Sequence, residues 1–171
     1  MKYSKLEHEL KKYNLSEVYF GSQGFIISSV DELENEQLGY SKHPDGTDLT
    51  GINHGDWLQG WVVFARDADL GDPIFTDTKD ENSPVYTAMH GEGEWCPELV
   101  SPNLTSFMAS LNFLASTTKE KCSRINPNEN TITDLNELSN LKNKLNELNK
   151  DSSFWSNFIE YHLEWIEESD F

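Results

Sequence analysis

The chain has 171 residues and a formal net charge of −17 at pH 7, with 36% hydrophobic and 25% charged residues. This composition is typical of a globular protein, and the length suffices for one domain with its own core. No apolar run reaches the roughly 18 residues of a membrane-spanning helix. Residues 1–15 are charged throughout and lack the apolar centre of a secretory signal, so we expect a cytoplasmic protein.

The negative charge is concentrated in the middle of the chain. Residues 43–100 contain 12 Asp or Glu against only Arg66 and Lys79, whereas residues 1–42 carry a net charge of −2 and residues 119–171 of −5. Such a zone repels nucleic acid and anionic membranes and attracts a basic protein. High acidity also keeps a protein soluble, so the charge alone leaves both interpretations open.

Patterns in the first third of the chain predict a helix, a strand, a short helix and a long loop. Residues 3–14 repeat apolar side chains every three or four positions, which is typical of a helix. Residues 25–29 suit a short strand, and Ser29 with Glu32 forms a capping box that predicts a short helix. Residues 39–59 are rich in Gly, Asp and Asn without any period, which predicts a long functional or mobile loop.

The centre of the chain predicts a β-meander. Residues 60–66 form a near-continuous apolar run typical of a central strand, and residues 73–78 and 84–90 follow after short turns. Short connections favour antiparallel pairing. Residues 95–100 suit a fourth strand, and Pro97 favours an edge position for it.

The last third of the chain predicts helices. Ser101 and Pro102 suit the start of a helix that carries no charge up to residue 118, which indicates burial. A linker at residues 119–131 separates it from two stretches with apolar side chains at helical spacing, which predict a helical hairpin packed on the domain.

The fold class expected is therefore α+β, a central mostly antiparallel sheet (meander, residues 60–100) flanked by helices, with a C-terminal helical hairpin. We expect an α+β domain over residues 1–118 and a helical extension over residues 119–171 that packs on the same domain.

Two acidic clusters offer ligands for a cation. His90, Glu92 and Glu94 alternate, so a strand would place them on one side, but the flanking glycines favour a tight turn with exposed acids. A second cluster, in residues 67–72, begins like a calcium loop, but Thr78 stands where the closing Glu is required. We therefore expect a hairpin turn capped by Asp side chains, which explains the same residues.

Catalytic signatures are weak. His54 and Asp56 could form an acid–base pair, alone or with His90, but nothing in the sequence shows that they meet in space. Cys96 and Cys122 have neither zinc spacing nor an activating signature, and a reducing compartment disfavours a disulfide. No nucleophile elbow or phosphate-binding loop occurs in the sequence. We therefore expect no enzyme activity, no metal and no cofactor.

Aromatic side chains accompany the acids. Trp61 lies in the apolar strand and is expected in the core, whereas Trp57 lies in the acidic loop and Trp95 beside the Gly-rich turn. Indoles among carboxylates are a common composition of binding hot spots, and such indoles also cover the rim of a core.

Three motifs and one tryptophan resemble the SUKH (Smi/Knr-like) superfamily, which joins bacterial toxin-immunity proteins to fungal cell-wall regulators. The resemblance is firmest over residues 25–118, and the pair Phe154 and Trp155 resembles the tail of some bacterial members. The motifs are GWVVFARD at 60–67, GDPIFTD at 71–77 and PVYTAMHGEG at 84–93, followed by Trp95.

This resemblance implies an α+β fold without enzyme activity and, for bacterial members, immunity by binding a secreted toxin that is often a nuclease. Because a nuclease binds a polyanion in a basic cleft, an acidic surface with aromatic anchors can occupy that cleft. The alternative is an intracellular regulator or scaffold of the Smi/Knr cell-wall type. Kinship of fold does not name the partner.

The predicted partner-binding residues lie in three loops, at 43–57, 67–72 and 90–95. They are Asp45, Asp48, Asp56, Trp57, Asp67, Asp69, Asp72, Glu92, Glu94 and Trp95.

Overall fold

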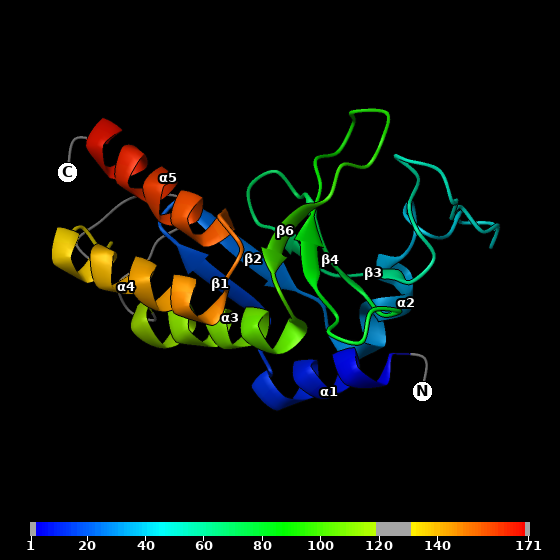
Figure 1. Cartoon of the computed structure of the whole chain (residues 1–171), viewed down its shortest axis with the longest axis horizontal. Helices are drawn as coiled ribbons and strands as arrows, with labels where there is room; N and C mark the ends of the chain where they lie inside the picture. The colour runs from blue at the N-terminus through cyan, green and yellow to red at the C-terminus, as the bar shows by residue number, and fades with distance from the viewer. Residues whose placement is uncertain (1–2, 119–130, 170–171) are drawn as a thin grey trace.

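A six-stranded antiparallel sheet forms the centre of the molecule (Figure 1). The computed structural model describes residues 3–118 and 131–169. Each strand pairs with its neighbours in the sequence, in the order β1-β2-β3-β4-β5-β6. The α+β class and the antiparallel meander are thereby confirmed. The strands are β1 (Glu17–Phe20), β2 (Gln23–Ile27), β3 (Trp61–Asp67), β4 (Pro73–Asp77), β5 (Val85–Thr87) and β6 (Glu98–Ser101).

Strand β1 is absent from the sequence-based prediction. It pairs with β2 across a two-residue turn, in which Gly21 adopts a φ of +59°. Glycine tolerates such a left-handed backbone at little cost, which suits a tight hairpin. Four residues are too few for an alternating pattern to stand out, so only the pairing with β2 defines this strand.

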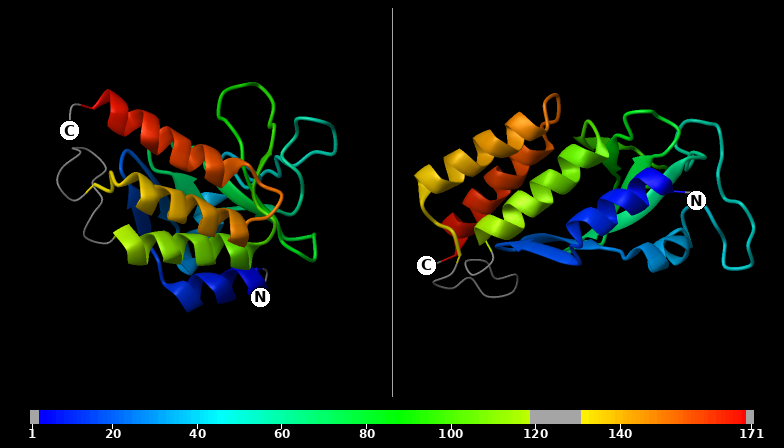
Figure 2. Two further views of the ribbon diagram at one scale, coloured as in Figure 1. Left: turned by 60° about the vertical axis from the view of Figure 1, so that its left-hand side comes forward. Right: turned by 90° about the horizontal axis from the view of Figure 1, so that it is seen from below.

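Helices cover one face of the sheet. They are α1 (Ser4–Tyr13), α3 (Leu104–Thr118), α4 (Leu135–Leu148) and α5 (Phe154–Glu168), and a short 3-10 turn (Val30–Glu32) continues into α2 (Leu33–Glu36). The view from below shows α1, α3, α4 and α5 layered against the strands (Figure 2). Across the described residues, no helix combines the length and apolarity that crossing a bilayer requires.

The helical face and the sheet share one core. Phe25 of β2 packs against Phe107 of α3 and against Trp155 and Phe158 of α5. The C-terminal hairpin thus buries its apolar face in the same cluster as the rest of the chain. Residues 119–130, which include Cys122 and most of the expected linker, lie outside the described residues.

Buried side-chain hydrogen bonds link the C-terminal hairpin to β6 and α3. The side chain of Asn149 donates to Ser110 Oγ at 2.7 Å and accepts a hydrogen bond from Ser101 Oγ. Ser101 is therefore part of β6 and not the predicted cap of α3. Asn103 takes that role, because its side chain accepts from the backbone N–H of Ser106 at 2.8 Å.

The opposite face carries a second, aromatic core. Trp57, Trp61, Val63, Phe75 and Ala88 form it, beneath the long loop that follows α2. Among the described residues, Tyr40, Leu58 and Trp95 pack on this cluster from loops and not from a helix.

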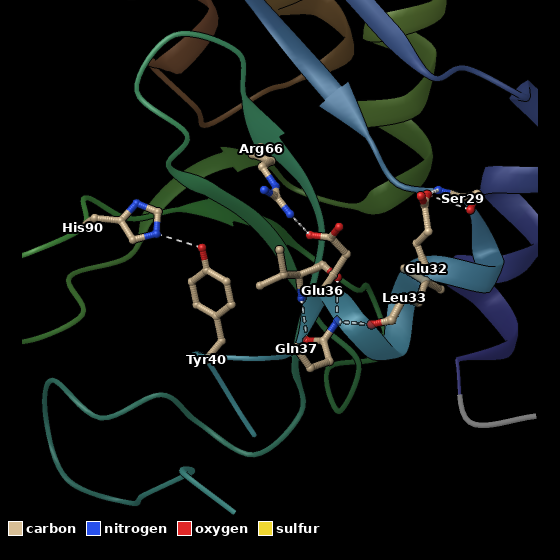
Figure 3. A network of polar contacts seen from close by, with 9 residues as sticks. Ser29, Glu32, Leu33, Glu36, Gln37, Tyr40, Arg66 and His90 are labelled. Atoms are coloured by element: carbon tan, nitrogen blue, oxygen red, sulfur yellow. Dashed lines mark hydrogen bonds and ion pairs between the residues drawn. The ribbon is translucent and has the colours of Figure 1, made fainter. Parts of the chain in front are cut away.

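The buried side chain of Gln37 fixes the start of that loop. Its amide donates to Val63 O at 2.8 Å and accepts from Val63 N at 3.1 Å (Figure 3). The same figure shows the predicted capping box of Ser29 and Glu32, which is confirmed. The start of the loop, directly after α2, is therefore hydrogen-bonded to the middle of β3.

Candidate functional site

A groove of about 970 Å³ opens between α5 and the loops at one end of the sheet. The β1–β2, β3–β4 and β5–β6 connections meet at this end, because every strand is antiparallel to its neighbours. In Figure 1, the β3–β4 turn lies between α5 on one side and the loop before β6 on the other. The groove is about twice the volume of a second pocket, of about 460 Å³, that residues of α3 and α4 line.

The groove, called the acidic groove below, is strongly negative. Eight carboxylates line it, and the lining contributed by the described residues contains no Lys or Arg. The side chains of this set are Asp67, Asp69, Asp72, Glu92, Glu94, Glu98, Glu164 and Glu168. Within residues 3–118 and 131–169, no Lys or Arg forms an ion pair with any of them. An approaching cation therefore meets an uncompensated negative field.

The floor of the acidic groove is apolar. Phe25 and Ile74 from the sheet and Phe158 from α5 contribute to its lining. The groove has a loop wall, formed by the 67–72 turn and the loop before β6, and a helix wall, formed by α5. Large apolar side chains are also exposed on both walls. Leu70 is 74% exposed and Met89 61% on the loop wall, and Tyr161 is 63% exposed on α5. Charge and exposed apolar surface thus occur together, as in protein-binding surfaces.

Hydrogen bonds between Asp72, His90 and Tyr40 connect the loops of this wall. His90 Nδ1 donates to Asp72 Oδ1 at 2.9 Å, and the backbone N–H of His90 donates to the same oxygen at 3.0 Å. The other ring nitrogen then accepts the hydroxyl of Tyr40 at 2.8 Å, as Figure 3 shows. These hydrogen bonds join the 67–72 turn, the 88–97 loop and the long loop.

Burial raises the pKa of Tyr40, so its hydroxyl stays protonated at neutral pH. A protonated phenol is a weak nucleophile, and Tyr40 has the geometry of a hydrogen-bond donor to His90. The arrangement can position loops and present charge.

Two predicted clusters adopt turn geometry. β5 ends at Thr87, so His90, Glu92 and Glu94 lie in a loop and not along one side of a strand. In the 67–72 turn, Asp67 Oδ2 accepts from Leu70 N at 2.6 Å, which is the Asp-capped turn. The described residues contain no group of three side chains that could hold a metal ion.

The predicted acid–base pair does not form. His54 Nδ1 lies 3.7 Å from Glu94 Oε2, whereas the carboxylate of Asp56 accepts from Asn53 N at 2.8 Å. Asp56 therefore closes a turn of its own loop. Cys96 is an exposed free thiol on the groove wall.

Five of the ten predicted partner-binding residues line the acidic groove. These are Asp67, Asp69, Asp72, Glu92 and Glu94. Asp45 and Asp48 lie elsewhere, in turns of the long loop. Hydrogen bonds from Thr47 lower the pKa of Asp45, and those from Thr50 lower the pKa of Asp48. Both carboxylates stabilise their own turns.

The prediction of an exposed indole at Trp57 is wrong. Trp57 is only 2% exposed, and its Nε1 donates to Trp61 O at 3.2 Å. Its ring packs edge-on against Trp95 at 5.1 Å between centroids. The acidic loop folds back over the sheet, and this large apolar ring fills the space beneath it. Trp95 stays half-buried beside His90 and outside the groove lining.

Sequence reasoning missed the contribution of α5. Tyr161, Glu164 and Glu168 recur at three- and four-residue spacing, so they share one face of the helix. That periodicity was readable, but nothing in the sequence indicates that this face lies opposite the 67–72 turn.

No protein-family model, curated protein or solved structure matches this chain.

Proposed function

We propose that this protein is a non-enzymatic, cytoplasmic protein-binding module that captures a basic protein partner in the acidic groove. The observation that carries the proposal is a groove lined by eight carboxylates over an apolar floor, with no Lys or Arg among the described lining residues. Complementary charge accelerates encounter, and desolvated apolar contacts then slow dissociation. A polyanion such as nucleic acid is repelled by the same field.

The partner class that fits best is a toxin domain with a basic cleft, such as a nuclease, which the protein neutralises. Two grounds support this proposal: the charge of the groove and the SUKH-like motifs of the sequence. An inhibitor that fills a cationic cleft excludes the substrate by occupying its binding site. The role proposed is therefore that of an immunity protein.

Paired baits test the proposal. Wild type, a groove variant (Glu92→Lys with Glu94→Lys) and a loop variant (Asp45→Lys with Asp48→Lys) are used to capture partners from the native host. We expect wild type and the loop variant to retain a basic polypeptide that the groove variant loses. For the purified partner, the groove variant should associate about tenfold more slowly at low salt. Coexpression with wild type should relieve the partner's toxicity.

Three results would contradict parts of this proposal. Retention by the groove variant means that the groove is not the binding site. An acidic or neutral partner removes the electrostatic argument. A partner that is harmless when expressed alone replaces immunity by the regulatory or scaffold role.

A further inference from the structure

We infer that the occupant of the acidic groove is a basic amphipathic α-helix of the partner, which lies along α5. This inference rests on the proposed function and adds the secondary structure and side-chain pattern of the bound element. Three features of the groove carry it: the spacing of side chains on α5, the position of the sheet edges, and the order of charge and apolar surface.

The first feature is the face that α5 presents. Its lining residues recur every three or four positions over the whole helix. They are Phe154, Asn157, Phe158, Tyr161, Glu164, Trp165 and Glu168. Such a stripe is the surface that a second helix packs against in ridges-into-grooves fashion. It is about 21 Å long at 1.5 Å per residue, which matches four helical turns of a partner.

The second feature is the unsuitability of the groove for a strand. An added strand needs an open sheet edge, and the edges of this sheet are β1 and β6. On β6, Leu99 O already accepts a hydrogen bond from Ser152 in the α4–α5 connection, at 2.8 Å. On β1, Tyr19 O accepts from Thr118 of α3 at 3.4 Å. In addition, no β1 residue lines the groove and β6 contributes only Glu98, so recognition in the groove relies on side chains, which a helix presents outward.

The third feature is the arrangement of chemistry across the groove. Apolar side chains form its floor, and carboxylates stand on both walls, with Asp69 and Glu92 on the loop side and Glu164 and Glu168 on α5. A helix with a central apolar stripe flanked by Lys or Arg matches this order. Met89, which is exposed on the loop wall, can adapt to different apolar partners because its side chain is unbranched.

Two synthetic peptides test the bound conformation. Both have 15 residues of Leu and Lys in the same ratio. In one, Leu recurs at helical spacing, and in the other Leu and Lys alternate with a period of two. We expect the helical peptide to bind at least tenfold more tightly by fluorescence anisotropy, and to gain helical circular dichroism on binding. Equal affinity for the two peptides overturns the inference.

Matched variants locate the peptide. Glu164→Gln should weaken binding about threefold, whereas Glu167→Gln, an exposed neighbour outside the groove lining, should leave it unchanged. Leu70→Ser should weaken binding about tenfold, and Leu135→Ser, which is 68% exposed on α4, should not. Equal effects of the two Glu variants overturn the placement along α5, and equal effects of the two Leu variants overturn binding in the groove.

Together, the peptide and charge-variant experiments distinguish an error in the helical occupant from an error in the binding site. If neither peptide binds but the Glu92→Lys and Glu94→Lys variant still loses the natural partner, the helical occupant is wrong and the groove remains the binding site. If the charge variant also retains the natural partner, both are wrong.

Discussion

His162 shows how a single buried side chain couples the fold to pH. It is 1% exposed on α5, and its Nε2 donates to Ile132 O at 2.8 Å. Its Nδ1 has no hydrogen-bond partner among the described residues, and its ring packs against the Phe20 ring at 4.3 Å between centroids. Burial lowers the pKa of His162, and the bond to the Ile132 carbonyl opposes that shift.

The sign of the pH effect follows from that shift. The unfolded chain binds a proton at His162 near pH 6.5, whereas the folded chain resists it until lower pH. Stability due to the neutral imidazole is therefore present above about pH 6.5 and is lost as the pH falls through the folded pKa. Between pH 7.5 and 5.5, wild type should lose free energy of unfolding relative to His162→Gln, measured by urea denaturation.

The control for this comparison is His8→Gln. His8 is exposed on α1, so its replacement should leave the pH profile of wild type unchanged. A profile for His162→Gln that runs parallel to wild type would show that the buried imidazole does not govern this pH range.

At the scale of elements, the strands and helices differ in how far the sequence predicted them. The apolar run at residues 60–66 and the charge-free stretch at residues 101–118 became β3 and α3, because both are dominated by burial. β5 is shorter than predicted. It ends at Thr87, which is the last of its residues to pair with both β4, at Ile74, and β6, at Glu98.

The long loop after α2 is an element whose role only packing defines. Its composition predicts a loop, and the structure shows that Tyr40 and Trp57 cover the second face of the sheet. Trp57→Ala should therefore lower the free energy of unfolding by about 3–5 kcal/mol, the usual cost of removing a buried aromatic ring. Urea denaturation measures this loss, and limited proteolysis should cut the variant faster within residues 39–59.

Trp95→Ala provides the comparison, because Trp95 is only half-buried and should cost less. If Trp57→Ala instead left stability unchanged and abolished partner binding, Trp57 would be an exposed anchor as first predicted.

At the scale of the whole molecule, the charge of the acidic groove favours partner binding and lowers the stability of the free protein. Eight carboxylates held at one end of the sheet repel each other in the free protein, and a partner relieves that repulsion. Screening by salt acts in the same direction. The melting temperature should therefore rise by about 3–8 °C between low salt and 0.3 M NaCl, measured by differential scanning calorimetry.

Glu164→Gln provides the internal check on this salt effect. It should melt at a higher temperature than wild type at low salt and should respond less to added NaCl. A melting temperature that falls as NaCl is added would show that attractive ion pairs outweigh the repulsion within the groove.

The sequence by itself determined the fold class, the antiparallel meander and the acidity of residues 43–100, because burial periodicity and charge are local properties of the chain. It also located Asp69 and Glu92 in candidate binding loops. Only the tertiary structure decided that the face of α5 with Glu164 lies opposite those loops, and that Trp57 is buried. Both outcomes depend on contacts between segments far apart in the sequence, and no local pattern encodes which surfaces meet.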